Sequence, residues 1–322
     1  MNQPNDPHAV RCFHRERGVM QDETTCCGAG LRFLYGSFLG GVARLVLRSR
    51  LVNKIGGLYF SSPLSLDHVK TFVQAGSIAM EEFEATDYNS FNEFFTRRFR
   101  AGARSFANAQ WEFPAFAEGR YLAFSRVTHD ITFPVKGYQL TPKAILGDEE
   151  QAEPFLGGPA LIARLNPYDY HRFHYPDSGR HIGSADLKGG LDSVNPFALR
   201  ARGSVFARNH RRVSYLTTQN FGRLAYVEIG AMGVGKIVQT KSTDDNFERG
   251  EEKGYFKYGG STVIVFGEPG FWQPTDDLLA RTAEQCETIV RLGTCVAHSL
   301  RRRAEIGKLV GQGDHAYRVT RG

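Results

Sequence analysis

The chain has 322 residues, of which 41% are hydrophobic and 23% charged, so it is typical of a folded protein with one large domain or two modest ones. Its formal net charge of +6 favours an anionic partner, such as lipid head groups or nucleic acid, without choosing between them. The cysteines are five in number and form no C-x-x-C pair, which argues against a disulfide framework and against a zinc site. A reducing cytoplasm is the simplest compartment for such a chain.

The first part of the chain divides into a polar leader and a basic apolar segment. Residues 1–30 have no apolar core, so we expect a poorly ordered leader rather than a secretory signal. Leu31 to Phe60 has five basic residues and no acidic one, with apolar residues at three- and four-residue spacings. This pattern is typical of an amphipathic helix that lies in an anionic membrane surface. A helix that packs on the core and turns its arginines to water has the same pattern, so both interpretations stay open.

Further helices are predicted before residue 111. Ser90 and Glu93 form a capping box, and the helix that it starts is expected to end near Gly102. A second helix is predicted over Leu66 to Ala75, ahead of a glycine. We therefore expect residues 31–110 to form a helical N-terminal region.

From about Trp111 the sequence changes to short β-type runs between Gly, Pro and Asn residues. Because these runs do not alternate with helices, a mainly antiparallel sheet is expected. A last helix is predicted from Thr275. We thus expect the α+β class, with a helical, membrane-associating N-terminal region followed by a β-rich domain over residues 111–322 that carries the candidate sites described next. The clearest strands are Arg120 to Val127, Pro159 to Leu165, Arg212 to Thr218, Gly222 to Ile229 and Thr262 to Phe266.

Two histidines form the first candidate site. His171 and His174 lie in a run that begins with Asn166-Pro167 and ends at Pro176. Asn166 can cap a short helical turn, and residues three apart on such a turn project from one side. Two imidazoles so placed suit proton transfer near neutral pH. Two other interpretations stay open, namely hydrogen-bonded packing residues, or metal ligands for which the turn offers no obvious third partner.

The second candidate is Gly259-Gly260-Ser261-Thr262, which opens a β-branched run. Its plain interpretation is a turn that leads into a strand. In the chemical interpretation, the glycines permit a bend that presents the Gly260 carbonyl to the Ser261 hydroxyl. Upstream, Lys253-Gly254-Tyr255-Phe256 partly matches the aromatic strand of RNA-recognition domains, but the second aromatic motif of those domains is absent.

Taken together, these segments resemble the phosphatidylserine decarboxylase family of self-cleaving, pyruvoyl-dependent enzymes. The resemblance leaves out only residues 1–30 and about the last twenty. The Gly-Gly-Ser-Thr form is similar to one bacterial branch of the family. The matching motifs, in chain order, are Leu31 to Gly36, Phe91 to Arg98, Asp169 to His174, Ser193 to Pro196, Gly230 to Ile237 and Gly259 to Thr262.

The resemblance implies that the chain cuts itself between Gly260 and Ser261. Ser261 would attack the Gly260 carbonyl to give an ester, which eliminates and hydrolyses to leave a pyruvoyl group. The products would be a β chain, residues 1–260, and an α chain, residues 261–322, which carries this covalent cofactor. The pyruvoyl ketone would form a Schiff base with the amine of phosphatidylserine, leading to phosphatidylethanolamine and CO2.

The resemblance also implies roles for single residues. His174 would help to activate Ser261 for cleavage, and His171 would transfer protons during decarboxylation. The family usually has an aspartate that orients the processing histidine, and this chain has Glu118 at that position. We expect Glu118 to orient His174 in a Ser–His–acid arrangement, and its extra methylene is compatible with slower maturation. In the alternative, Glu118 caps a surface turn and another group orients His174.

The expected partners are phosphatidylserine, an anionic phospholipid membrane and the chain's own α and β products, with a homodimer left open. The enzyme would be peripheral, at the cytoplasmic face of the membrane, and we expect neither a nucleic-acid partner nor a metal. Two rival functions stay open: a pyruvoyl-dependent decarboxylase of a soluble amino acid, and an unprocessed, non-catalytic lipid-surface homologue. An RNA-binding module would show salt-sensitive affinity for nucleic acid, and a metal hydrolase would retain stoichiometric metal.

Overall fold

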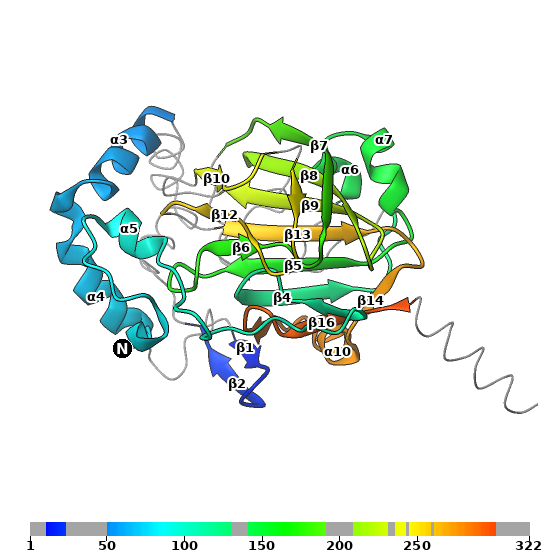
Figure 1. The fold of residues 1–322 in the computed structure, drawn as a ribbon, viewed down its shortest axis with the longest axis horizontal. Coiled ribbons are helices and arrows are strands. Elements are labelled where there is room, and N and C mark those ends of the chain that lie inside the picture. Colours follow the sequence, from blue (N-terminus) through cyan, green and yellow to red (C-terminus); the bar gives the residue numbers. More distant parts are fainter. Residues whose placement is uncertain are drawn as a thin grey trace, which may run out of the picture.

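A ten-stranded sheet forms the centre of the protein, and two three-stranded sheets and the helices surround it (Figure 1). In the computed structural model, the described residues are 11–23, 50–129, 141–190, 209–230, 236–242, 245–258 and 261–300. Paired strands of the large sheet are antiparallel except for β1 with β15, so the predicted α+β class with a mainly antiparallel sheet is confirmed.

The strands of the large sheet, in spatial order, are β11 (Asn246–Phe247), β7 (Gly179–Leu187), β8 (Arg211–Thr218), β9 (Arg223–Gly230), β13 (Ser261–Gly267), β5 (Ala160–Leu165), β4 (Gly119–Phe124), β15 (Thr288–Val290), β1 (Arg11–His14) and β2 (Val19–Asp22). One small sheet contains β10 (Ile237–Gln239), β12 (Glu252–Phe256) and β6 (Arg172–His174), in that order. The other contains β14 (Trp272–Pro274), β16 (Cys295–Ser299) and β3 (Glu112–Pro114). The five predicted strands correspond to β4, β5, β8, β9 and β13, with ends that shift by up to a few residues.

The helices are short, and none in the described part of the chain is long and apolar enough to cross a membrane. The α-helices are α3 (Arg50–Phe60), α4 (Asp67–Gly76), α5 (Phe91–Phe95), α6 (Pro142–Leu146), α7 (Glu149–Ala152) and α10 (Asp276–Ala283). Single 3-10 turns occur at Pro63–Ser65, Met80–Glu82 and Glu153–Phe155.

Both faces of the large sheet are covered, and strand β13 shows this directly. All seven of its residues are buried. Successive side chains of a strand point to opposite faces. Val263 and Val265 accordingly join the core cluster beneath the small sheets, whereas Ile264 and Phe266 join the cluster beneath α6 and α7. Ser261 and Val263 are two residues apart and share a face of the strand, so the side chain of Ser261 must also point toward the small sheets.

Helices α3, α4 and α5 lie together beside one end of the sheets (Figure 1). Phe91, Phe94 and Phe95 of α5 form a cluster against which apolar side chains of α3 and α4 pack. The predicted helix over Leu66 to Ala75 is confirmed as α4. Of the basic segment Leu31 to Phe60, residues 50–60 are the helix α3, and residues 31–49 lie outside the described part.

The helix that starts at Ser90 is shorter than predicted. Ser90 caps it as expected, since its hydroxyl accepts from the backbone N of Glu93 at 3.2 Å. The helix nevertheless ends at Phe95, so its expected extension toward Gly102 is wrong. Tertiary contacts outweigh the local pattern here, because Phe99 forms a β-bridge with Phe83 and stacks on its ring at 4.6 Å.

Residues 11–23 of the polar leader are more ordered than their composition suggested. Residues 11–22 form the hairpin of β1 and β2, and β1 extends the large sheet by pairing with β15. The expectation of poor order is therefore wrong for this part of residues 1–30. The physical reason is Glu23, a buried carboxylate that follows the hairpin.

Glu23 joins the hairpin to the centre of the protein. Its carboxylate contacts Arg120 Nε at 2.9 Å and Arg164 Nη2 at 2.8 Å, and it accepts from Asn166 Nδ2 at 2.8 Å. Burial alone would raise the pKa of Glu23, but Arg164 and Arg120 outweigh it and lower the pKa to about 2. The carboxylate is thus ionised at neutral pH, and two buried guanidinium groups share its single negative charge.

Replacing Glu23 by Gln should lower the free energy of unfolding by about 3 kcal/mol, because two buried arginines lose a charged partner. Asp22→Asn is the matched control, since Asp22 pairs with Arg11 at 3.5 Å on the exposed surface, where such pairs contribute at most about 1 kcal/mol. Denaturant unfolding of both variants in the uncleaved Ser261→Ala chain measures the difference. Because the folded pKa is lowered, the contribution of Glu23 should be complete above pH about 4.5 and disappear as the pH falls to about 2. Equal effects of the two substitutions would contradict this assignment.

Candidate active site

Ser261 occupies a rigid and buried position at the start of β13. Its backbone lies between two strands, with Leu165 of β5 on one side and Gly230 of β9 on the other. Its side chain is fully buried on the face toward the small sheet that contains β6. The prediction that Ser261 opens a strand is confirmed.

His171 is the residue that meets this hydroxyl. It directly precedes β6, and its Nδ1 lies 3.2 Å from Ser261 Oγ. The other ring nitrogen, Nε2, lies 3.1 Å from the carbonyl oxygen of Asn166 and 3.2 Å from that of Pro167. Carbonyl oxygens only accept hydrogen bonds, so Nε2 must carry the proton and Nδ1 must present its lone pair to Ser261. The Ser261 hydroxyl therefore donates to His171.

The surroundings of His171 keep its ring neutral. It is fully buried, and the ring of Phe95 stacks on it with centroids 3.9 Å apart. Burial, together with the positive charge of Arg97, lowers the pKa of His171 to about 3. The backbone carbonyls raise it by a smaller amount. A neutral imidazole with a free lone pair beside a hydroxyl is arranged as a general base.

The turn that holds His171 is built by its own side chains. Asn166 Oδ1 accepts from the backbone N of Tyr168 at 3.1 Å, and Asp169 Oδ2 accepts from the backbone N of Asn166 at 2.7 Å. Asn166 thus caps a turn as predicted. The expectation that His171 and His174 project from one side is wrong, because Arg172–His174 is a strand rather than a continuation of that turn.

His174 lies in this strand and makes separate contacts. Its Nδ1 is 2.9 Å from the carbonyl oxygen of Gly250, and its Nε2 is 3.3 Å from the hydroxyl of Tyr170. Burial lowers the pKa of His174 too. The structure thus brings His171, and not His174, into hydrogen-bond contact with Ser261. The role of His174 in cleavage stays a prediction.

Glu118 is engaged by an arginine instead of a histidine. Its carboxylate accepts from Arg104 Nε at 2.6 Å and Nη2 at 2.8 Å, and from the backbone N of Leu292 at 3.1 Å. The expected hydrogen bond from His174 to Glu118 is not formed between these described residues. The link is indirect, because the backbone N of His174 donates to the carbonyl oxygen of Phe116, two residues before Glu118, at 2.8 Å. The arginine at position 104 explains the difference, since a bidentate guanidinium satisfies a carboxylate better than a neutral imidazole does.

The sequence predicted no role for Phe95, Tyr170 or Asn92, although each contacts a candidate site histidine or the chain that leads to Ser261. Phe95 covers His171, Tyr170 contacts His174, and Asn92 accepts from the backbone N of Tyr258 at 2.8 Å. The only signal was indirect, because Asn92 and Phe95 belong to one of the motifs that carried the family resemblance.

A cavity of about 410 Å³ is lined in part by the turn that holds His171. Arg97, Glu118, Tyr168 and Asp169 are among the residues that line it. Neither Ser261 nor His171 is among the described residues of its lining, so this cavity is separate from their contact.

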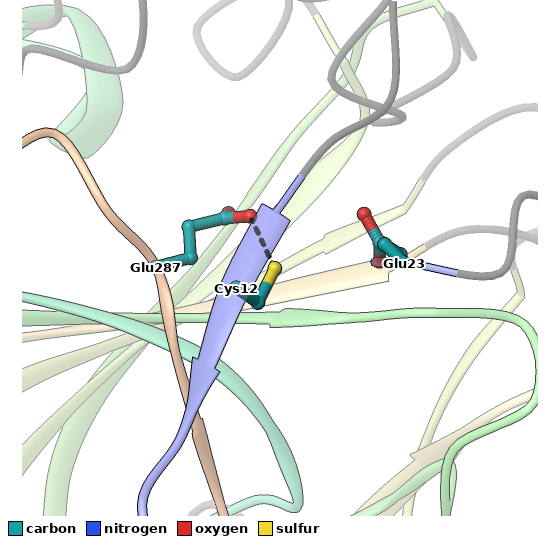
Figure 2. Close-up of side chains that lie close together, drawn as sticks. All are labelled: Cys12, Glu23 and Glu287. Atoms are coloured by element: carbon teal, nitrogen blue, oxygen red, sulfur yellow. Dashed lines mark hydrogen bonds between the residues drawn. The ribbon is translucent and has the colours of Figure 1, made fainter. Parts of the chain in front are cut away.

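Cys12, Glu23 and Glu287 lie close together, and their ligand atoms are within 4.8 Å of one another (Figure 2). Arg164 Nη2 already contacts both carboxylates, at 2.8 and 2.6 Å. Burial also raises the pKa of the Cys12 thiol, which keeps it protonated. The donor set is therefore better described as an ion-pair cluster than as a metal site.

Comparison with known proteins gives this site its context. A sequence profile described as phosphatidylserine decarboxylase matches residues 91–296. The chain belongs to the phosphatidylserine decarboxylase family. It is similar to the phosphatidylserine decarboxylase proenzyme of Ruminiclostridium cellulolyticum, with 32% identity over 92% of this chain and 100% of the relative. The proenzymes of Clostridium perfringens and Clostridium tetani are 36% and 37% identical over 84% and 88% of this chain, and over 94% and 96% of their own lengths.

The phosphatidylserine decarboxylase match confirms the resemblance on which the sequence analysis relied, and it includes both histidines, Glu118 and Ser261. Glu23, which braces Asn166, lies outside the matched residues. The hairpin that precedes Glu23 likewise lies outside the residues that this profile matches.

His171→Ala should slow self-cleavage by a factor of about 10² to 10⁴, because it removes the base that contacts Ser261. His174→Ala is the comparison, since it removes another buried imidazole, one that makes no hydrogen bond to the hydroxyl. Time courses of precursor synthesised in a cell-free system, resolved on denaturing gels, measure both rates. A block by His174→Ala together with normal cleavage of His171→Ala would show that the observed contact is not the productive one.

Proposed function

We propose that the chain is a phosphatidylserine decarboxylase that cleaves itself between Gly260 and Ser261 and converts phosphatidylserine to phosphatidylethanolamine and CO2. The observation that carries this proposal is the contact between neutral His171 and the buried hydroxyl of Ser261. The similarity to proenzymes of this name, over most of the chain, supports the substrate and the need for maturation.

Self-cleavage follows from the orientation of this hydrogen bond. His171 Nδ1 takes the hydroxyl proton as Ser261 Oγ bonds to the carbonyl carbon of Gly260. The bond from that carbon to the Ser261 nitrogen then breaks, and the nitrogen takes up the proton, which leaves an ester. Loss of the Ser261 Cα proton expels the Gly260 carboxylate, and water then replaces the nitrogen, which leaves as ammonia.

Residue 261 is also well placed to carry the resulting pyruvoyl group. Such a group supplies a ketone that withdraws electrons from the carbon that loses CO2. Its surroundings fit, because the position is dry and strand β13 fixes the backbone. His171 remains beside it, and its Nδ1 can hold or return a proton there. This matches the role in decarboxylation that the family resemblance implied for His171.

Docking on a membrane is a further part of the proposal. Helix α3 has no acidic residue, and Ile55 and Leu58 are 58% and 66% exposed on it. Leu64, in the turn that follows, is 77% exposed. Apolar side chains on a basic helix suit a peripheral position on anionic lipid at the cytoplasmic face of the membrane.

The wild-type chain should yield two fragments, residues 1–260 and 261–322, and the smaller should lack a free amino terminus. Intact mass spectrometry measures this, and release of phosphatidylethanolamine from phosphatidylserine vesicles measures the activity. Ser261→Ala is the control, because it removes the nucleophile and should remain one uncleaved, inactive chain. An intact wild-type chain would favour the unprocessed homologue, and activity only on free amino acids would favour the soluble substrate.

Replacing both Ile55 and Leu58 by Ser should weaken binding to phosphatidylserine vesicles by at least about tenfold, because each buried aliphatic side chain contributes roughly 1.5–3 kcal/mol. Ile182→Ser is the matched control, since Ile182 is 46% exposed on β7, a strand of the large sheet, and is not part of α3. Vesicle co-sedimentation measures the binding. If the double variant binds as well as the control, α3 is not the docking surface.

A further inference from the structure

Asn92 connects the helical region to the chain that leads into the cleavage site. Its side chain is buried in helix α5, and its Oδ1 accepts from the backbone N of Tyr258 at 2.8 Å. Its Nδ2 donates to the hydroxyl of Ser61 at 2.9 Å. Both ends of this amide are therefore used, and one of them holds the backbone close to residue 261.

The helix that presents Asn92 is itself held firmly. Ser65 Oγ accepts from the backbone N of Phe91, the first residue of α5, at 2.9 Å. The ring of Tyr258 packs on the same helix, with centroids 5.1 Å from Phe91 and 5.2 Å from Phe95. Asn92 thus acts from a fixed support, and Tyr258 is held both by its backbone and by its ring.

The hydrogen bond between Asn92 and Tyr258 is significant because Tyr258 is close to Ser261 in the chain. Tyr258 and Ser261 are three residues apart, so the chain between them spans at most about 11 Å. Ser261 is fixed in β13, and Tyr258 is fixed by Asn92. Between them stand Gly259 and Gly260, the two residues with the widest choice of backbone conformations. The course of so short a stretch of chain depends mainly on what holds its two ends.

We propose that Asn92 is a positioning residue for self-cleavage, which holds the chain upstream of the scissile bond so that the Gly260 carbonyl meets Ser261 Oγ. This inference rests on the proposed cleavage between Gly260 and Ser261. Phe95 of the same helix covers His171. Helix α5 therefore positions both the Gly260 carbonyl, which is attacked, and His171, which is the base, relative to the Ser261 hydroxyl.

Asn92→Ala should slow self-cleavage by about a hundredfold, because a misplacement of about 1 Å in a reacting group has effects of that size. Asn92→Asp should recover most of the rate, since it keeps an acceptor for the Tyr258 N–H and the Ser61 hydroxyl can turn to donate. Asn89→Ala is the matched control, because Asn89 is an exposed asparagine three residues away, and it should leave the rate unchanged. Cell-free time courses on denaturing gels measure all three.

A second readout separates positioning of the attack from a general loss of structure. Hydroxylamine cleaves the ester that forms when Ser261 attacks Gly260. If Asn92→Ala slows this attack, no ester accumulates, and hydroxylamine should release no additional fragments from the variant. Thermal unfolding of the uncleaved Ser261→Ala chain, with and without Asn92→Ala, shows whether the fold survives. If the fold does not survive, Asn92→Gln is tested in place of Asn92→Ala, because glutamine keeps the amide and moves the acceptor by one methylene.

The possible results distinguish failure of the positioning role of Asn92 from failure of the proposed self-cleavage. Cleavage of Asn92→Ala at the wild-type rate, cleavage of Asn92→Asp as slow as that of Asn92→Ala, or release of fragments by hydroxylamine would each overturn the positioning role. A wild-type chain that does not cleave at all would instead overturn the proposed function on which it rests.

Discussion

The orientation of one buried imidazole is the constraint on which the site depends. Two carbonyl oxygens, those of Asn166 and Pro167, face His171 Nε2 and leave its Nδ1 as an acceptor for Ser261. A carboxylate at the same place would also fix the tautomer, but its charge would raise the pKa of the ring. Burial and the positive charge of Arg97 instead lower the pKa of His171 to about 3, although the two carbonyls raise it by a smaller amount, so the base is unprotonated at neutral pH. The neutral carbonyls thus set the tautomer and stabilise the protonated ring less than a carboxylate would.

The turn that supplies these carbonyls depends in turn on charges brought from distant parts of the chain. Asn166 is bonded to Glu23 from the N-terminal hairpin, and Asp169 of the same turn pairs with Arg120 of β4. Arg120 also contacts Glu23, so the two carboxylates share one cation. Buried charges are tolerated only when each has a partner. The network therefore ties the hairpin, the large sheet and the turn into one arrangement.

The sequence allowed prediction of features that depend on neighbouring residues. The β-type runs that became β8, β9 and β13, the capping of α5 by Ser90 and the capped turn at Asn166 are all local features. The family motifs also identified the candidate site residues. Contacts between distant residues were not accessible in this way, since the spacing of His171 and His174 says nothing about a partner 90 residues further on. Glu118 shows the same limit, because its partner Arg104 lies in no motif that the sequence analysis had used.

The contact between His171 and Ser261 brings two stages of the reaction to one place. Before cleavage, the Ser261 hydroxyl occupies the lone pair of Nδ1 and supplies the proton that must be removed. In the proposed maturation that hydroxyl is consumed, because its oxygen leaves with Gly260 when the ester is eliminated. The same nitrogen would then be free beside residue 261, where the proposed decarboxylation needs a proton transfer. A base assigned to decarboxylation by family resemblance can for this reason also be the base that starts maturation, and no movement of the imidazole is required between the two tasks.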